Sequence, residues 1–255
     1  TNAFAAIANG GIYTKPVFFT QILDHNGKVL LENAPETKRV LKDSTAFLLT
    51  DAMSQSMESS RMFASSGVSL NSTSAVANIP GMSNAGKSGT TTNNNDIWFV
   101  GFTPYYTAGI WSGCDDNQKI SAIGSSTSYH KKIWKKIMTT IHEGLADTGF
   151  PVPSSVTTAQ ICRKSGKLAI PGVCDHDPRG SAVYTEYFAK GTVPTKVCDH
   201  HVQLTVCSES GGLATEYCPE KTTRTFMVIP EGESGGTDDS KYRSPGTCTI
   251  HGSSS

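Results

Sequence analysis

The chain has 255 residues, enough for one large or two modest domains, and its hydrophobic share of 37% is ordinary for a globular protein. Lysine plus arginine and aspartate plus glutamate balance at 22 each, so the charge gives no reason to expect a nucleic acid or an anionic membrane as partner. No run reaches the ~18 apolar residues of a membrane span.

The N-terminal part of the sequence predicts two helices with a hairpin between them. Residues 3–8 are rich in alanine and predict the end of a helix, which stops at Gly10-Gly11 because glycine accepts the left-handed cap conformation. Residues 12–31 predict a hairpin that turns at Asp24-His25-Asn26-Gly27. Ser44 can cap a second helix, whose apolar positions follow a helical period and are typical of a core face.

The most informative motif is Gly86-Lys87-Ser88-Gly89-Thr90-Thr91, because a lysine, a hydroxyl residue and a glycine in sequence form the third motif of active-site-serine acyl transferases. If the segment is a strand at the edge of a cleft, Lys87, Gly89 and Thr91 face one side, and Ser88 and Thr90 face the other. Gly89 would let a substrate backbone approach and add to the strand.

The same residue types define roles in an acyl transfer. The hydroxyls of Ser88 and Thr90 would bind a carboxylate, the Thr90 N–H would face a developing oxyanion, and Lys87 would supply the positive field. We therefore predict catalytic roles for Lys87 and Thr90. The predicted substrate-binding residues are Ser88, Gly89, Thr90 and Thr91.

Two strands and a helix are predicted after the motif. Residues 97–102 and 106–112 are almost continuously apolar, as in a sheet covered by helices on both faces, so Trp98 and Trp111 are expected in the core. Residues 129–145 predict an amphipathic helix. Its apolar stripe comprises Ile133, Ile137, Ile141 and Leu145, with Trp134 and Met138 beside it, and its basic outer face comprises Lys131, Lys132, Lys135 and Lys136.

Read in order, residues 4–116 resemble the carboxy-terminal half of a penicillin-binding protein transpeptidase domain, in particular that of the bifunctional class A enzymes. The matching segments are 5–13, 15–16, 22–30, 39–41, the Lys87 motif, 96–104 and 111–113. The resemblance implies an α/β fold, with a partial transpeptidase domain over residues 1–150, in which an antiparallel sheet is flanked by helices. A small β-rich, loop-rich tail would follow over residues 151–255.

The resemblance implies a peptidoglycan D,D-transpeptidase that forms a serine acyl-enzyme with stem peptides and with β-lactams. A glycosyltransferase domain and a membrane anchor would precede it, on the extracytoplasmic face of the bacterial membrane. Neither nucleophile motif of the family is present in a fitting place, because Ser128-Tyr129-His130-Lys131 follows the Lys87 motif and Ser69-Leu70-Asn71 lies in a serine-rich loop. We therefore expect a partial chain that is inactive alone and uses no cofactor or metal.

Two other functions remain open. The chain could be a non-catalytic wall-binding or scaffold module, in which the cysteine-containing tail engages glycan or protein. It could also be a relative of D,D-carboxypeptidases and β-lactamases, which use water as the acceptor, although the class A-like order of segments disfavours this. Retention of the tail on purified peptidoglycan and competition between acceptors would separate these possibilities.

The tail follows a linker-like segment at 150–155 and contains a repeat offset by 45 residues, in which 161–169 resembles 206–214. Each copy, about 161–201 and 206–251, has three cysteines and ends in Cys-x-x-His. Three thiolates and an imidazole could bind zinc, but the ligand spacings are wider than usual. For a protein outside the membrane we favour disulfides, because the six tail cysteines can pair completely, and the favoured bridges are Cys162 with Cys174 and Cys207 with Cys218. Cys114, which lies outside the tail, is then an incidental thiol.

Overall fold

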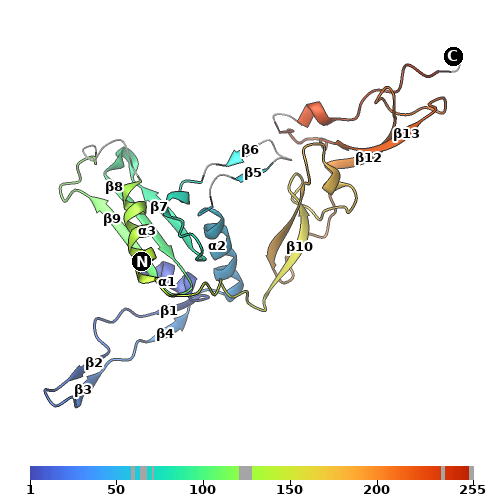
Figure 1. Ribbon diagram of the computed structural model, residues 1–255. Coiled ribbons are helices and arrows are strands. Elements are labelled where there is room, and N and C mark those ends of the chain that lie inside the picture. Colours follow the sequence, from blue (N-terminus) through green and yellow to red (C-terminus); the bar gives the residue numbers. More distant parts are fainter. Residues whose placement is uncertain (59–60, 64–67, 71, 121–127, 237–238, 253–255) are drawn as a thin grey trace. The chain divides into compact units, whose positions relative to one another are not determined.

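The computed structural model describes residues 1–58, 61–63, 68–70, 72–120, 128–236 and 239–252 (Figure 1). The chain divides into two compact units. Unit 1 comprises Thr1–Arg61 and Asn71–Val156, and unit 2 comprises Met62–Leu70 and Thr157–Ser255. No helix among the described residues is long and apolar enough to cross a membrane.

A three-stranded antiparallel sheet forms the centre of unit 1. Its strands are β7 (Ala85–Thr90), β8 (Asp96–Phe102) and β9 (Thr107–Gly113), in that order. The aromatic and β-branched residues of β8 favour an extended chain, and β8 lies in the middle with partners on both sides. The predicted pair of strands after the Lys87 motif is therefore present.

Helices cover both faces of this sheet. Phe99 packs edge-on against Trp134 of α3 (Tyr129–Ile141), with ring centroids 5.1 Å apart. Phe102, three residues further along β8, faces the opposite side and packs with α1 (Asn2–Ala8) and α2 (Asp43–Gln55). This arrangement confirms the predicted antiparallel sheet flanked by helices.

Short strand pairs and single turns make up the rest of unit 1. In the predicted hairpin, Gly27 adopts φ +81°, and its N–H donates to the Asp24 carbonyl at 3.0 Å. The strand pairs of unit 1 are β1 (Ile12–Thr14) with β4 (Thr37–Arg39) and β2 (Gln21–Leu23) with β3 (Val29–Glu32). A further pair, β5 (Arg61–Phe63) with β6 (Val68–Leu70), belongs almost entirely to unit 2. The short 3-10 helices of the chain are η2 (Ala75–Ala77), η3 (Thr92–Asn94), η4 (Cys174–His176) and η5 (Asp239–Tyr242).

Helix α3 packs on a different face from the one that the sequence predicts. Trp134 and Met138 are fully buried, whereas Ile133, Ile137 and Ile141 are each 44% exposed. Gly101 explains the choice, because a Cβ there would lie 2.7 Å from the Trp134 ring, so its absence makes room for the indole. The four-residue spacing fits either set of residues, and the size of Trp134 decides between them.

Two further predictions about side chains are wrong. Lys131 is buried rather than part of a basic outer face, and its Nζ donates to the Thr73 carbonyl at 2.6 Å. Trp98 and Trp111 are 43% and 45% exposed, with ring centroids 6.3 Å apart. The short helix α1 reaches only the far end of their face, so these two indoles remain uncovered.

The segment predicted to be a linker is attached to unit 1. Phe150 packs against Phe102 with ring centroids 5.7 Å apart, and the Ser155 hydroxyl donates to Asp43 Oδ1 at 2.6 Å. These contacts fix the chain up to the start of the tail. The Ser155 hydrogen bond is also the chief cause that lowers the pKa of Asp43.

The tail consists of two strand pairs, β10 (Val156–Cys162) with β11 (Val183–Ala189) and β12 (His201–Cys207) with β13 (Lys221–Met227). The predicted disulfides are wrong, because all seven cysteines are free. In each copy a third cysteine and a histidine reach the same place as the predicted pair, so four side chains meet there instead of two.

The lowered pKa of His130 predicts how the free energy of unfolding changes with pH. Burial, and secondarily the charge of Lys131, lowers the pKa of this histidine below its ordinary 6.5. The unfolded chain therefore takes up a proton near pH 6.5 that the folded chain does not, and stability falls as the pH drops below that value, by at most about 1.4 kcal/mol per pH unit. Urea unfolding of the His130→Leu variant should show a flatter pH dependence between pH 7.5 and 5.5. Identical slopes for both proteins would contradict this assignment.

Candidate active site

Strand β7, which carries the Lys87 motif, is an edge strand. It pairs with β8 on one side, and no strand pairs with its other side among the described residues. Lys87, Gly89 and Thr90 are exposed, and Ser88 is half-buried. The motif therefore lies on a strand with one open edge.

The directions of the backbone groups along β7 follow from its hydrogen bonds. The Gly86 carbonyl accepts from Ser56 Oγ at 3.0 Å and the Ser88 carbonyl accepts from Lys87 Nζ at 2.9 Å, whereas the Thr91 N–H donates to Asp96 at 3.0 Å. Backbone groups alternate in direction along a strand, so the N–H and C=O groups of Gly86, Ser88 and Thr90 point away from β8. The Thr90 N–H consequently faces the open edge.

A tight turn fixes the end of this edge. The Asp96 N–H donates to Thr91 Oγ1 at 2.8 Å, so the Thr91 hydroxyl takes part in closing the turn. Asn93 and Asn94 then adopt left-handed conformations, with φ of 69° and 58°, which asparagine tolerates better than most residues. Within this chain, Thr91 has a turn-forming role rather than a free side chain.

The two glycines of β7 meet different surroundings. A Cβ at Gly86 would lie 2.5 Å from the buried ring of Phe99, so packing inside the chain requires glycine there. A Cβ at Gly89 would approach nothing closer than 3.5 Å, an ordinary contact distance, and Gly89 lacks a positive φ. Nothing in the described chain requires glycine at position 89.

The charge of Lys87 acts on a second lysine, Lys131 of α3. Burial lowers the pKa of Lys131, and the charge of Lys87 lowers it further. Sequence reasoning missed this residue because it assigned Lys131 to the outer face of the helix. The available signal was its position three residues before Trp134, on the same helical face.

Two hollows of unit 1 lie away from β7. One is lined by residues of α1, α2 and the segment 150–153, and the other by α1, β1 and the loop 103–107. Lys87 does not line either of them, so neither hollow forms a cleft along the open edge of β7.

Comparison with known sequences agrees with these features. Residues 1–139 match the family model of the penicillin binding protein transpeptidase domain. The chain belongs to this family. Residues 152–203 match the model of the penicillin-binding protein 1A C-terminal domain, which assigns the first part of the tail as well. The predicted membership of the penicillin-binding protein family is confirmed.

Relatives in this family are long proteins. Penicillin-binding protein 1A of Clostridium botulinum is 34% identical over 236 residues, covering 92% of this chain and 27% of the relative. Penicillin-binding protein 2D of Bacillus subtilis is 35% identical, covering 77% of this chain and 26% of the relative. The chain thus spans about a quarter of the length of these relatives.

A solved structure supports the fold. The crystal structure of penicillin-binding protein 1A from Haemophilus influenzae matches 77% of this chain and 32% of its own, with a TM-score of 0.60 and 22% sequence identity. At this identity the match concerns the fold alone.

The two glycines provide a matched pair of substitutions. Gly86→Ala should lower the free energy of unfolding by about 1–3 kcal/mol, because the methyl group would overpack against Phe99. Gly89→Ala should change it by less than about 0.5 kcal/mol, because the site has room for a methyl group. Chemical denaturation of the two variants measures both values, and equal losses would show that the packing around β7 differs from this description.

Proposed function

We propose that this chain forms the substrate-binding edge of a serine-type D,D-transpeptidase that cross-links cell-wall stem peptides. The observation that carries the proposal is the open edge of β7, which presents Lys87, Gly89 and the Thr90 backbone together. The attacking serine would come from residues outside this chain, and the intact enzyme would act at the extracytoplasmic face of the bacterial membrane.

The exposed edge supports binding of an extended peptide. A stem peptide would lie beside β7 as an added strand, with its terminal carboxylate near the hydroxyls of Ser88 and Thr90. A side chain at position 89 would have room within this chain, so packing inside the chain does not explain the glycine. The close approach of an external backbone would explain it. The exposed Lys87 would attract the carboxylate.

The chemistry follows from the same positions. A serine hydroxyl attacks the penultimate D-alanine carbonyl, the terminal D-alanine leaves, and a neighbouring amine then takes the acyl group. The Thr90 N–H, which faces the open edge, would donate to the oxyanion that forms during attack. A β-lactam carbonyl would occupy the same place and acylate the same serine.

Exposed apolar side chains in unit 1 indicate that other segments of the intact protein pack against it. Ile133, Ile137 and Ile141 form an exposed stripe on α3, and Trp98 with Trp111 forms an exposed pair on the opposite face of the sheet. Contiguous apolar surface of this kind marks interaction sites in soluble proteins. We infer that other segments of the intact enzyme cover these surfaces.

Labelling with a fluorescent penicillin tests the proposed function. The intact protein that contains this chain should be labelled, and the isolated 255 residues should not. In the intact protein, Lys87→Ala should slow acylation about 10²-fold or more, because it removes charge stabilisation at the reacting carbonyl. The exposed Lys132 provides the control, and Lys132→Ala should leave the rate unchanged. Covalent labelling of the isolated chain would contradict the proposal.

The inferred covering of α3 can be tested separately. Ile137→Gln should change the unfolding free energy of the isolated chain by less than about 0.5 kcal/mol, because Ile137 is exposed there. In the intact protein the same substitution should cost about 1–3 kcal/mol, because it would bury an amide without partners. Met138→Gln is the matched control and should destabilise both proteins, since Met138 is fully buried. Equal effects of Ile137→Gln in both would contradict the covering.

A further inference from the structure

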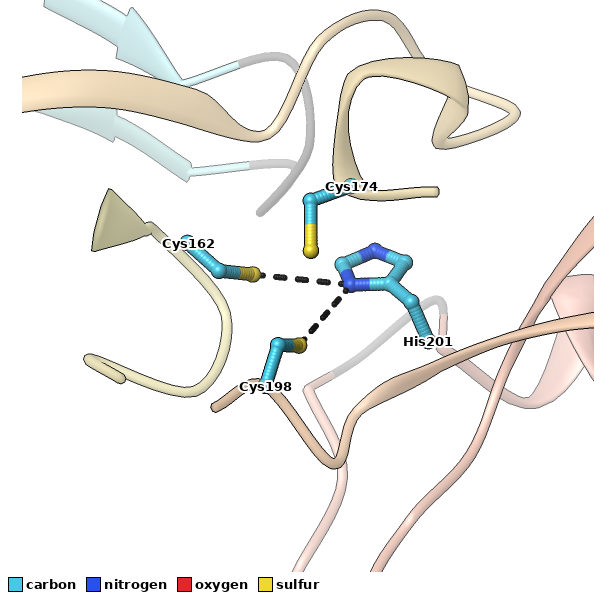
Figure 2. A group of neighbouring side chains, drawn as sticks. All are labelled: Cys162, Cys174, Cys198 and His201. Atoms are coloured by element: carbon cyan, nitrogen blue, oxygen red, sulfur yellow. Dashed lines mark hydrogen bonds between the residues drawn. The ribbon is translucent and has the colours of Figure 1, made fainter. Parts of the chain in front are cut away.

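The tail contains two groups of four side chains that meet at a point. Cys162, Cys174, Cys198 and His201 form the first group, and Figure 2 shows the three thiols and the imidazole directed toward one another. Cys207, Cys218, Cys248 and His251 form the second group. In each group the possible ligand atoms all lie within 4.8 Å of one another.

The sulfur–nitrogen distances fit tetrahedral zinc. His201 Nδ1 lies 3.5 Å from Cys162 Sγ and 3.4 Å from Cys198 Sγ. His251 Nδ1 lies 3.4 Å from Cys207 Sγ and 3.6 Å from Cys248 Sγ. Zn–S bonds of about 2.3 Å and Zn–N bonds of about 2.0–2.1 Å at a tetrahedral angle place sulfur and nitrogen about 3.6 Å apart.

Carboxylates orient both histidines. His201 Nε2 lies 2.8 Å from Asp177 Oδ2, with both side chains fully buried, and His251 Nε2 lies 3.2 Å from Glu209 Oε2. A carboxylate only accepts hydrogen bonds, so Nε2–H is the donor and the lone pair of Nδ1 faces the thiols. Arg179 in turn holds Asp177 through Nε at 3.0 Å. Metal-binding histidines are typically held in this way.

Backbone N–H groups point at the sulfur atoms as well. The N–H of Ile170 donates to Cys174 Sγ at 3.2 Å, that of His200 to Cys198 Sγ at 3.4 Å, and that of Thr215 to Cys218 Sγ at 3.3 Å. Such donors stabilise negative charge on sulfur, and the thiolate is the form that binds a metal.

The buried clusters of the tail consist largely of these cysteines. One contains Cys162, Cys174 and Cys198 with Ala182, and the other contains Cys207, Cys218 and Cys248. Disulfides cannot pair three cysteines within a group, whereas one ion bonds to all three thiolates and to the imidazole. A bound ion also stabilises a small module whose apolar core is limited.

We propose that each group binds one structural Zn²⁺ ion, with three thiolates and one histidine Nδ1 as ligands. Four protein ligands close the coordination sphere, so the ions hold the tail together and take no part in acyl transfer. This inference stands independently of the proposed transpeptidase activity.

Strand β12 links the two sites mechanically. Its first residue, His201, belongs to the first group, and its last residue, Cys207, belongs to the second. Six residue steps at about 3.3 Å each span about 20 Å along a strand. The two ions should therefore lie about 20 Å apart, and loss of one site should loosen the strand that carries a ligand of the other.

Metal content of the full 255-residue chain tests the proposal. After removal of loosely bound metal, mass spectrometry should find two zinc ions per chain. His201→Ala and His251→Ala should each retain about one, and Cys114→Ser, which changes the exposed thiol outside both groups, should retain two. A chain with no zinc, or one whose six tail cysteines resist alkylation as disulfides after unfolding, would overturn the proposal. An unchanged zinc content in either histidine variant would overturn that site.

A milder substitution guards against loss of folding. Asp177→Asn keeps all four ligands of the first group but removes the charge that orients His201, and it should weaken zinc binding about 10–100-fold in competition with a chelator. The exposed Asp175 is the control, and Asp175→Asn should leave the affinity unchanged. Cobalt(II) in the apo chain should give thiolate charge-transfer absorption and tetrahedral d–d bands. Equal chelator affinities for the Asp177→Asn and Asp175→Asn variants, or octahedral cobalt spectra, would contradict the proposed coordination.

Discussion

The pairing of β7 with β8 is the constraint on which unit 1 depends. Phe99 fills the α3 side of the sheet, and its ring occupies the space that a side chain at Gly86 would need. This packing fixes β7 beside β8 and leaves its other edge open. The same alternation that turns Lys87 and Thr91 backbone groups toward β8 turns those of Ser88 and Thr90 away from it.

The open edge and the exposed apolar side chains have a common physical basis. An edge strand presents unpaired N–H and C=O groups, and natural proteins usually cover or blunt such edges. Here the Ser56 hydroxyl at the end of α2 bonds the Gly86 carbonyl, and the rest of the edge carries lysine and hydroxyl groups. An exposed isoleucine stripe lies on α3, which covers one face of the sheet, and an exposed indole pair lies on the other face. Together they support the proposed binding of a peptide along the edge and of further protein on the exposed apolar side chains.

The tail has a different basis for its stability. Its two strand pairs bury few large apolar side chains, and the buried clusters gather cysteines around a histidine in each copy. The repeated sequence thus builds one arrangement twice, down to a carboxylate behind each imidazole. Strand β12 starts in one group and ends in the other, so the two groups share one strand.

Sequence alone determined the family, the helices and strands around the Lys87 motif, and the repeat of three cysteines and one histidine, because these depend on local order and spacing. It did not determine which face of α3 is buried, since four-residue spacing fits two stripes and only the space above Gly101 selects Trp134. Tertiary structure also decided that Lys131 is buried, that Trp98 and Trp111 are exposed, and that four side chains meet where a disulfide was expected. Each of these outcomes depends on contacts between residues far apart in the chain, and no local pattern encodes such contacts.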